Sequence, residues 1–327
     1  MDHEPSVIDS RWRRAALACI ASFAGTLALV LIVVVVIDPY DSGRFPTFMP
    51  AGSPDQRQPT IAISRGRDPR FNAAMIGSSR SVLVDPRRIS ALTGFHFVNV
   101  AVEGATIREQ TAILHWFAHN HSRVDAIVAA TDQTWCDHDP ALRGSTDFPY
   151  GLYSDSYVDY FRATLSTSTF TFAKERILYA LGRMPGVDPE SFYDTEHKHD
   201  WRWPNPPHPD WGPAVPPISG ALNWPALARF DATLKDVAGS PAILLWMPPL
   251  HRDALPPPDT AAGRELAACK QALRDWTRQR PHAAFLDLAV DTPETADRSN
   301  FLEPTHVNIR FTRIIEPQLA EAINQLK

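Results

Sequence analysis

Two adjacent serines, Ser78 and Ser79, follow a short apolar run that ends at Gly77 in the stretch NAAMIGSSRSVLVDP. A serine hydroxyl becomes an effective nucleophile when a neighbouring imidazole accepts its proton, and a carboxylate then orients that imidazole. A Ser-Ser turn is common by itself, so the rest of the chain must supply the other two groups. Glu303 and His306, which belong to the sequence EPTH near the C-terminus, are the candidates for carboxylate and base.

The alternation of apolar runs and helical patterns shows how residues so distant in sequence could meet. Five apolar runs are typical of buried strands, at residues 72–78, 95–102, 124–131, 241–247 and 283–290. Helical patterns separate them, including a short helix that begins at Pro86 and ends before Gly94. Continuous apolar strands separated by helices predict an α/β fold whose central parallel sheet, of about five strands, is covered on both faces.

Polar residues follow each predicted strand, at the edge where open α/β sheets bind ligands. After the first strand they are Ser78 and Ser79; the candidates after later strands are Gly104, Thr131, Asp132, His251, Glu303 and His306. Each has an ordinary explanation alone, since a lone glycine makes a turn and a lone histidine is usually a surface residue. Their shared placement at one edge is what indicates a site for acyl transfer, because backbone N–H groups beside glycines can also hold an oxyanion.

The order of these motifs resembles the SGNH/GDSL esterase and acyltransferase superfamily. GSS matches the first block with Ser79 in the nucleophile position, NVAVEG matches the second with Gly104 as an oxyanion donor, and EPTH matches the last with His306 as base. The resemblance covers about residues 70–325, without the central insertion. It implies a flavodoxin-like three-layer α/β/α fold.

Two departures from the family pattern concern the carboxylate and the oxyanion hole. Glu303 stands where the family has aspartate, and it can still orient a histidine through a longer arm. AATD offers Thr131 where the family has asparagine, and a hydroxyl is shorter than an amide. The loss of one oxyanion donor costs about 10²–10³ in rate. Asp132 and His251 complete the predicted substrate-binding set.

The N-terminal segment predicts the compartment. Residues 15–37 contain no charged residue, and about 20 apolar residues suffice to cross a bilayer as a helix. Arg11, Arg13 and Arg14 precede this run, so the positive-inside rule places residues 1–14 in the cytoplasm and the main domain outside. A cleaved signal peptide is the competing interpretation, but its apolar region would be only about 7–15 residues long.

The remaining chain divides into a linker at 38–70 and an SGNH-like domain at 71–327, with an insertion at about 137–224. The insertion is rich in proline and tryptophan, which favours either an ordered cap of tryptophans packed on prolines or a wall for a sugar ring. The HKHD sequence at 197–200 is more typical of a solvated loop than of a metal site. The net charge of -5, without a basic cluster in the body of the chain, argues against a nucleic-acid partner.

The three cysteines leave one question open. Cys19 lies in the apolar helix, whereas Cys136 and Cys269 belong to the outer domain and could pair in an oxidising compartment. Sequence spacing cannot show whether they meet.

The resemblance to membrane-tethered superfamily members implies a single-pass protein of the bacterial inner membrane with a periplasmic domain. We expect a serine acyl-esterase or O-acyltransferase that acts on a cell-surface polysaccharide or another acylated envelope polymer, without a metal or an organic cofactor. Some similar proteins work beside a multispanning membrane acyltransferase, which is therefore an expected partner. The alternative is a catalytically inactive member that binds polysaccharide or scaffolds an export complex.

Overall fold

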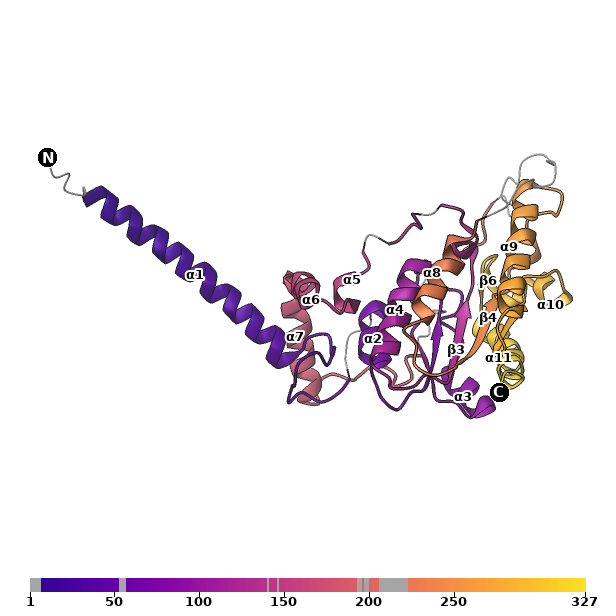
Figure 1. Cartoon of the computed structure of the whole chain (residues 1–327), viewed down its shortest axis with the longest axis horizontal. Helices are drawn as coiled ribbons and strands as arrows, with labels where there is room; N and C mark the ends of the chain where they lie inside the picture. Colours follow the sequence, from indigo (N-terminus) through magenta and orange to yellow (C-terminus); the bar gives the residue numbers. More distant parts are fainter. Residues whose placement is uncertain are drawn as a thin grey trace.

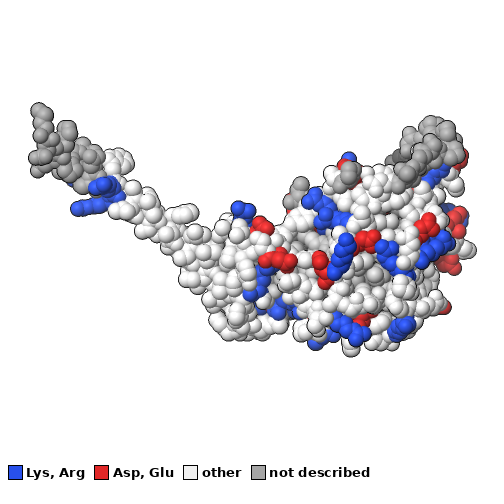
Figure 2. Space-filling view, in the orientation of Figure 1, with Lys and Arg blue, Asp and Glu red and all other residues white. Residues whose placement is uncertain are grey.

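The computed structural model describes residues 7–52, 57–139, 141–145, 147–192, 196, 200–205 and 223–327. Helix α1 (Val7–Ile37) projects from the folded body as a long rod (Figure 1). Its Arg11–Ile37 part contains an 18-residue window with a mean hydropathy of 2.9 and is long and apolar enough to cross a membrane. Figure 2 shows this rod as an uncharged surface with one cationic cluster near its N-terminal end. The expected apolar helix is therefore present, and its orientation in a membrane stays a prediction.

The folded body is built on a five-stranded parallel sheet. Its strands are β1 (Ala73–Ile76), β2 (Phe97–Asn99), β3 (Ala126–Ala130), β4 (Ala242–Met247) and β5 (Ala283–Asp287), in the spatial order β2-β1-β3-β4-β5. The first four are fully buried, as continuous apolar runs predict. Every predicted strand coincides with an observed one, and the prediction of a parallel sheet is confirmed.

Successive strand residues pack into two different hydrophobic clusters, because side chains alternate across a strand. Ile76, Ile127 and Leu245 join one cluster, and Met75 and Val128 join the other. The first cluster includes residues of helices α2 (Gln58–Gly66), α4 (Ile107–His119), α8 (Pro225–Leu234) and α9 (Ala261–Arg278). The second includes residues of α3 (Pro86–Thr93) and α11 (Ile309–Asn324).

Local signals account for where the helices next to the site begin and end. The Asp85 side chain accepts a hydrogen bond from the N–H of Arg87 at the start of α3, and Gly94 ends that helix with φ 74°. Thr106 and Glu109 form a capping box at the start of α4, which follows β2. These two helices hold the loops at the carboxyl ends of β1 and β2.

A second, two-stranded antiparallel sheet lies near the C-terminus. It pairs β6 (Phe301–Glu303) with β7 (His306–Val307), directly before α11. Two short helical turns lead into it, α10 (Pro293–Ala296) and η3 (Arg298–Asn300), and α10 contacts the turn η2 (Arg252–Ala254) that follows β4. The EPTH motif is therefore a tight hairpin.

The described part of the insertion after β3 contains three helices. It follows η1 (Gln133–Cys136) and contains α5 (Tyr150–Tyr153), α6 (Tyr157–Thr164) and α7 (Thr167–Ala180). Helix α7 contacts α1, and Figure 1 shows α6 and α7 beside the end of the rod. The insertion thus connects the sheet domain with the apolar helix.

Residues 38–70 differ from the expected linker. Helix α2 occupies part of this segment, and Tyr40 and Ile63 are buried in the main hydrophobic cluster. Asp41 is fully buried and forms an ion pair with Arg176 of α7, at 2.9 Å. Asp41 also pairs with Arg65 and Arg67 of the same segment, so local and distant partners together make the segment a folded part of the domain.

Candidate active site

The β6–β7 hairpin brings the predicted carboxylate and base together. Glu303 and His306 are cross-strand partners on either side of the two-residue turn Pro304–Thr305. Side chains of directly paired residues lie on one face of a sheet, within reach of each other. Glu303 Oε1 accepts a short hydrogen bond from Nδ1 of His306. It also accepts one from the N–H of Thr305, at 3.0 Å, which fixes the carboxylate.

The nucleophile candidate lies on the turn that follows β1. The hydroxyl of Ser79 is 2.8 Å from Nε2 of His306, across a sequence separation of 227 residues. This distance is that of a good hydrogen bond. With Nδ1–H donated to Glu303, the other ring nitrogen carries a lone pair and is the acceptor for the Ser79 O–H. The three side chains therefore form one continuous chain of hydrogen bonds.

Gly77 lets this turn pack closely against the sheet. A Cβ atom at Gly77 would lie 2.2 Å from Oγ of Ser81 and 2.7 Å from Cβ of Ala130. Ser81 also donates two hydrogen bonds, from its N–H and its hydroxyl, to the carbonyl of Ser78, both at 3.0 Å. The local bonds of the turn therefore involve the Ser78 carbonyl, and Ser79 is the serine that reaches His306.

Electrostatics keep the carboxylate charged. Partial burial alone would raise the pKa of Glu303, but hydrogen bonds from His306 and Thr305 outweigh burial, so its pKa lies below the ordinary value of 4.5. An ionised Glu303 stabilises the imidazolium that forms when His306 accepts a proton. The site is therefore arranged for proton transfer from a hydroxyl.

Two backbone N–H groups near the nucleophile have no hydrogen-bond acceptor in the described part of the chain, those of Ser79 and Gly104. Gly104 lies in a turn closed by the N–H of Ala105 and the carbonyl of Val102, and its φ of 70° suits glycine. The N–H of Val102 donates to the carbonyl of Gly77, which aligns the two loops. Gly104 itself lines a separate cavity of about 410 Å³ with Gln58 and Glu103.

Thr131 does not point toward the nucleophile. Its N–H and its hydroxyl both donate to the carbonyl of Trp246 on β4, at 2.8 and 3.1 Å. The side chain is fully buried there. Thr131 therefore cannot supply the donor that asparagine supplies in the third block, because its hydroxyl proton is already engaged.

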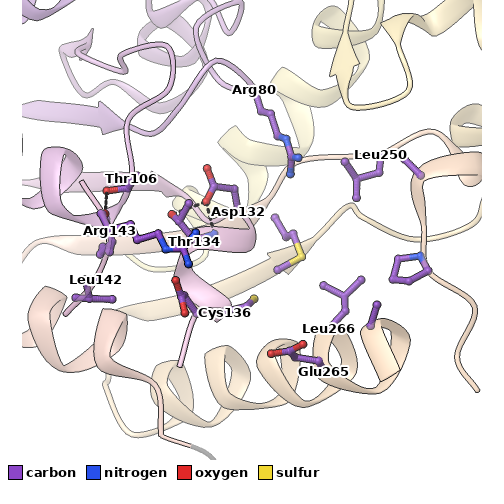
Figure 3. A pocket seen from close by; sticks show the side chains of 16 residues that line it. Arg80, Thr106, Asp132, Thr134, Cys136, Leu142, Arg143, Leu250, Glu265 and Leu266 are labelled. Carbon is purple, nitrogen blue, oxygen red and sulfur yellow. Dashed lines mark hydrogen bonds between the residues drawn. The ribbon is translucent and has the colours of Figure 1, made fainter. Parts of the chain in front are cut away.

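Asp132 lines a cavity that is also lined by Arg80, the residue after Ser79, but by none of Ser79, Glu303 and His306. The carboxylate caps η1 by accepting hydrogen bonds from the N–H and the hydroxyl of Thr134, at 2.8 and 2.7 Å. The cavity measures about 580 Å³ and is walled mainly by apolar side chains, which include Leu142, Met247, Leu250 and Leu266 (Figure 3). An ionised carboxylate accepts hydrogen bonds only, so Asp132 is no oxyanion donor.

Arg80 is a functional candidate that the sequence reasoning missed. It follows Ser79 directly, and Figure 3 shows its side chain directed into the same cavity as Asp132. Burial lowers the pKa of the guanidinium, whereas the charges of Asp132 and Glu303 oppose this shift. The charges of Asp132 and Glu303 thus favour the cationic form of Arg80, whose side chain lines the cavity. The position of this arginine directly after Ser79, in the sequence GSSR, is the signal that could have identified it.

His251 supports the hairpin instead of lining the cavity. It is buried, and its N–H donates to the carbonyl of Pro304, at 2.8 Å, in the turn between Glu303 and His306. Its Nδ1 accepts a hydrogen bond from the N–H of Asp253. The predicted substrate-binding residue is thus placed where it can position the acid–base hairpin.

Tryptophans of the insertion lie beside these histidines. The ring of Trp201 is 5.0 Å from that of His306, and Trp203 meets His251 edge-on at 4.8 Å. Trp201 thus borders the site, which is compatible with both a packed cap and a sugar-binding wall. Most of the proline-rich stretch and the two histidines of HKHD lie outside the described residues.

The two cysteines of the folded body, Cys136 and Cys269, lie close enough to pair. Cys136 and Cys269 form a disulfide, with their Cα atoms 5.4 Å apart. It links η1, which borders the 580 Å³ cavity, to α9, which supplies part of the opposite wall. Among the described residues, no group of three or more His, Cys, Asp or Glu side chains is arranged to hold a metal ion.

Comparison with known proteins adds no assignment. No protein-family model matches the chain, and no curated protein matches its sequence significantly.

Proposed function

We propose that this protein is a membrane-anchored serine acyl-esterase or O-acyltransferase of the SGNH type, with a flavodoxin-like three-layer domain. The observation that carries the proposal is the hydrogen-bonded chain from Ser79 through His306 to Glu303. The strand order β2-β1-β3-β4-β5 supports the fold assignment, because flavodoxin-like sheets share it. The carboxyl ends of these strands carry the candidate residues.

In the proposed reaction, Ser79 Oγ attacks an acyl carbonyl while its proton passes to Nε2 of His306. The tetrahedral intermediate collapses, and the imidazolium returns the proton to the departing alcohol. Water or a sugar hydroxyl then attacks the acyl-serine with His306 again as base, which releases an acid or an acylated sugar. Glu303 stays ionised throughout and holds the imidazole.

The oxyanion would be stabilised by the backbone N–H groups of Ser79 and Gly104, with Arg80 as the third donor. A guanidinium carries five N–H donors and a permanent charge, so it can replace the amide that the third loop lacks. Arg80 follows Ser79 directly in the chain and points into the 580 Å³ cavity, which supports this role. Asp132 would keep the guanidinium in place by charge attraction.

The substrate class follows from the anchor and the cavity. A periplasmic domain tethered to the bacterial inner membrane would meet envelope glycans, and the mainly apolar cavity lined by Arg80, the residue after Ser79, would suit an acyl group. The Cys136–Cys269 disulfide supports an oxidising compartment. A multispanning acyltransferase that delivers acyl groups would be a natural partner in the transfer reaction.

The alternative function, a catalytically inactive polysaccharide-binding or scaffold protein, is supported by Thr131, whose hydroxyl donates to the carbonyl of Trp246 instead of facing the site. Hydrolysis of p-nitrophenyl acetate by the detergent-solubilised full chain separates the two functions, with His306→Ala as the matched variant. We expect turnover by the wild type and loss of at least about 10³-fold in the variant, since members of a triad act as a unit. Equal, background rates for both proteins would favour the scaffold.

A further inference from the structure

Exposed apolar side chains are concentrated next to the outer end of α1. Outside α1, ten large hydrophobic side chains of the described residues are exposed. Seven belong to α6, α7 or their immediate surroundings: Phe48, Tyr157, Val158, Leu165, Phe170, Ile177 and Leu181. The rest of the folded body contributes only Leu92, Val290 and Ile314. A large exposed apolar surface of this kind marks an interaction site.

Four exposed residues on α7 and its C-cap form one stripe. Phe170, Lys174, Ile177 and Leu181 are separated by four, three and four residues, which is the spacing of one helix face. The opposite face, which includes Phe172 and Arg176, is buried against the segment that follows α1. Lys174 can extend its charged end past the apolar side chains, as lysines do at membrane surfaces. Helix α7 therefore carries apolar side chains on its exposed face as well as on its buried face.

Buried polar contacts attach this helix rigidly to α1. Arg176 donates from Nε to the carbonyl of Ile37, the last residue of α1, at 3.0 Å. Its Nη2 pairs with Asp41 at 2.9 Å, and both side chains are fully buried. Tyr40 Oη is 3.0 Å from Oγ1 of Thr169 in the first turn of α7. These contacts therefore fix the position of the exposed stripe on α7 relative to Ile37, the C-terminal end of α1.

If α1 spans the bilayer, the exposed stripe on α7 lies at the level of the membrane surface. Arg176 touches the residue at which the apolar run ends, and Ile177 is its neighbour on the outward face. Figure 2 shows uncharged surface that runs from the rod onto the adjoining part of the folded body, and Lys174 is the charged residue of the exposed stripe on α7. Tyr157 on α6 adds an aromatic ring, a residue type that is enriched at membrane interfaces.

We propose that α6 and α7 form a membrane-binding surface that lies in the outer headgroup region of the bilayer. Its occupant is lipid, because the surface continues that of the spanning helix. The arrangement would hold the candidate active site in a fixed orientation above the membrane. The proposal rests on α1 as an anchor and is independent of esterase activity.

Depth-dependent fluorescence quenching in nanodiscs tests this surface in the full chain. Single cysteines replace Phe170 or Leu181 in a Cys19→Ala background and carry the fluorophore NBD, while the native disulfide stays oxidised. Nanodiscs contain phosphatidylcholine and phosphatidylglycerol, with or without phospholipids that carry a nitroxide near the top of the acyl chain. Ile314→Cys, an exposed apolar site on α11, is the matched control, and Phe23→Cys on α1 is the positive reference.

We expect the nitroxide lipids to remove roughly half of the NBD emission at positions 170 and 181, since interfacial helices lie about 5–10 Å into the headgroup boundary. Position 314 should be unaffected, and position 23 should be strongly quenched. Unquenched signals at 170 and 181 with a quenched position 23 would overturn the proposal. A blue-shifted but unquenched emission there would also overturn it, because protein would then cover the surface. Unquenched NBD at position 23 would show that α1 is not inserted in the membrane, and the proposal would then fail with its premise.

Discussion

Replacement of Glu303 by glutamine isolates the contribution of the triad charge. All three hydrogen bonds that fix this side chain converge on one oxygen, Oε1, with His306 and Thr305 as donors. A glutamine carbonyl can occupy the same position, so the neutral variant can keep the geometry and lose only the charge. In the wild type that charge faces the imidazolium formed during acylation.

The magnitude follows from Coulomb's law. Two unit charges about 4 Å apart interact by about 4 kcal/mol at an effective dielectric constant of about 20. Since 1.36 kcal/mol is tenfold in rate, Glu303→Gln should slow acylation of Ser79 by about 10³-fold. The assay is the second-order rate of fluorophosphonate labelling, with a thermal melt to verify folding. Thr305→Val removes the hydroxyl donor to Oε1 but keeps the backbone N–H of residue 305 and the charge of Glu303, so it should cost far less.

The pH dependence of stability provides a second measurement on the same variant. Because the folded-state pKa of Glu303 is depressed, its stabilising contribution is present above the unfolded pKa and is lost as pH falls through the folded value. The stability difference between wild type and Glu303→Gln should therefore persist at pH 4.5 and shrink only below it. Near-normal labelling by Glu303→Gln would refute the assigned role and leave His306 with another partner.

Three further outcomes follow from the structure. Arg80→Gln should lower the labelling rate by about 10²–10³-fold, as the loss of one oxyanion donor does, and an unchanged rate would exclude it from the oxyanion hole. Asp41→Asn leaves Arg176 buried without its charge partner and should cost about 3–5 kcal/mol in denaturant unfolding, whereas a loss below about 1 kcal/mol, typical of exposed pairs, would contradict the rigid attachment of α1. Joint replacement of Cys136 and Cys269 by alanine should lower stability by up to about 5 kcal/mol under non-reducing conditions, and equal stability of the two proteins would contradict the observed pairing.

The sheet and the acid–base pair could be predicted because each depends on local sequence. Continuous apolar runs specify buried strands, and the positions that follow them must lie at one edge of a parallel sheet. Glu303 and His306 are three residues apart, so a tight turn alone brings them together. The prediction that Ser79 meets His306 required a further step, because the loop after β1 and the C-terminal hairpin had to meet at the same edge of the sheet.

Features that depend on distant partners could not be predicted. Residues 38–70 have the composition of a linker, yet Asp41 is fixed by Arg176, which is 135 residues away. The disulfide closes a separation of 133 residues that no local pattern encodes. The direction of the Thr131 hydroxyl depends on the carbonyl of Trp246, so residue type alone could not show that it leaves the oxyanion hole.

The two serines of the GSSR sequence provide the control for the central claim, that Ser79 is an activated nucleophile. Ser78 contributes its carbonyl to the turn, and Ser79 Oγ alone of the two hydroxyls contacts His306. Ser78→Ala should therefore keep most of the reactivity, with a modest loss if the turn loosens. Ser79→Ala should abolish it.

The most direct measurement is mass spectrometry of the full chain after reaction with a fluorophosphonate, followed by identification of the modified peptide. We predict a single adduct on Ser79, which disappears in Ser79→Ala and persists in Ser78→Ala. An adduct on Ser78 would move the nucleophile by one residue. No adduct on a folded wild-type chain, under conditions that label a known serine esterase, would contradict the serine mechanism.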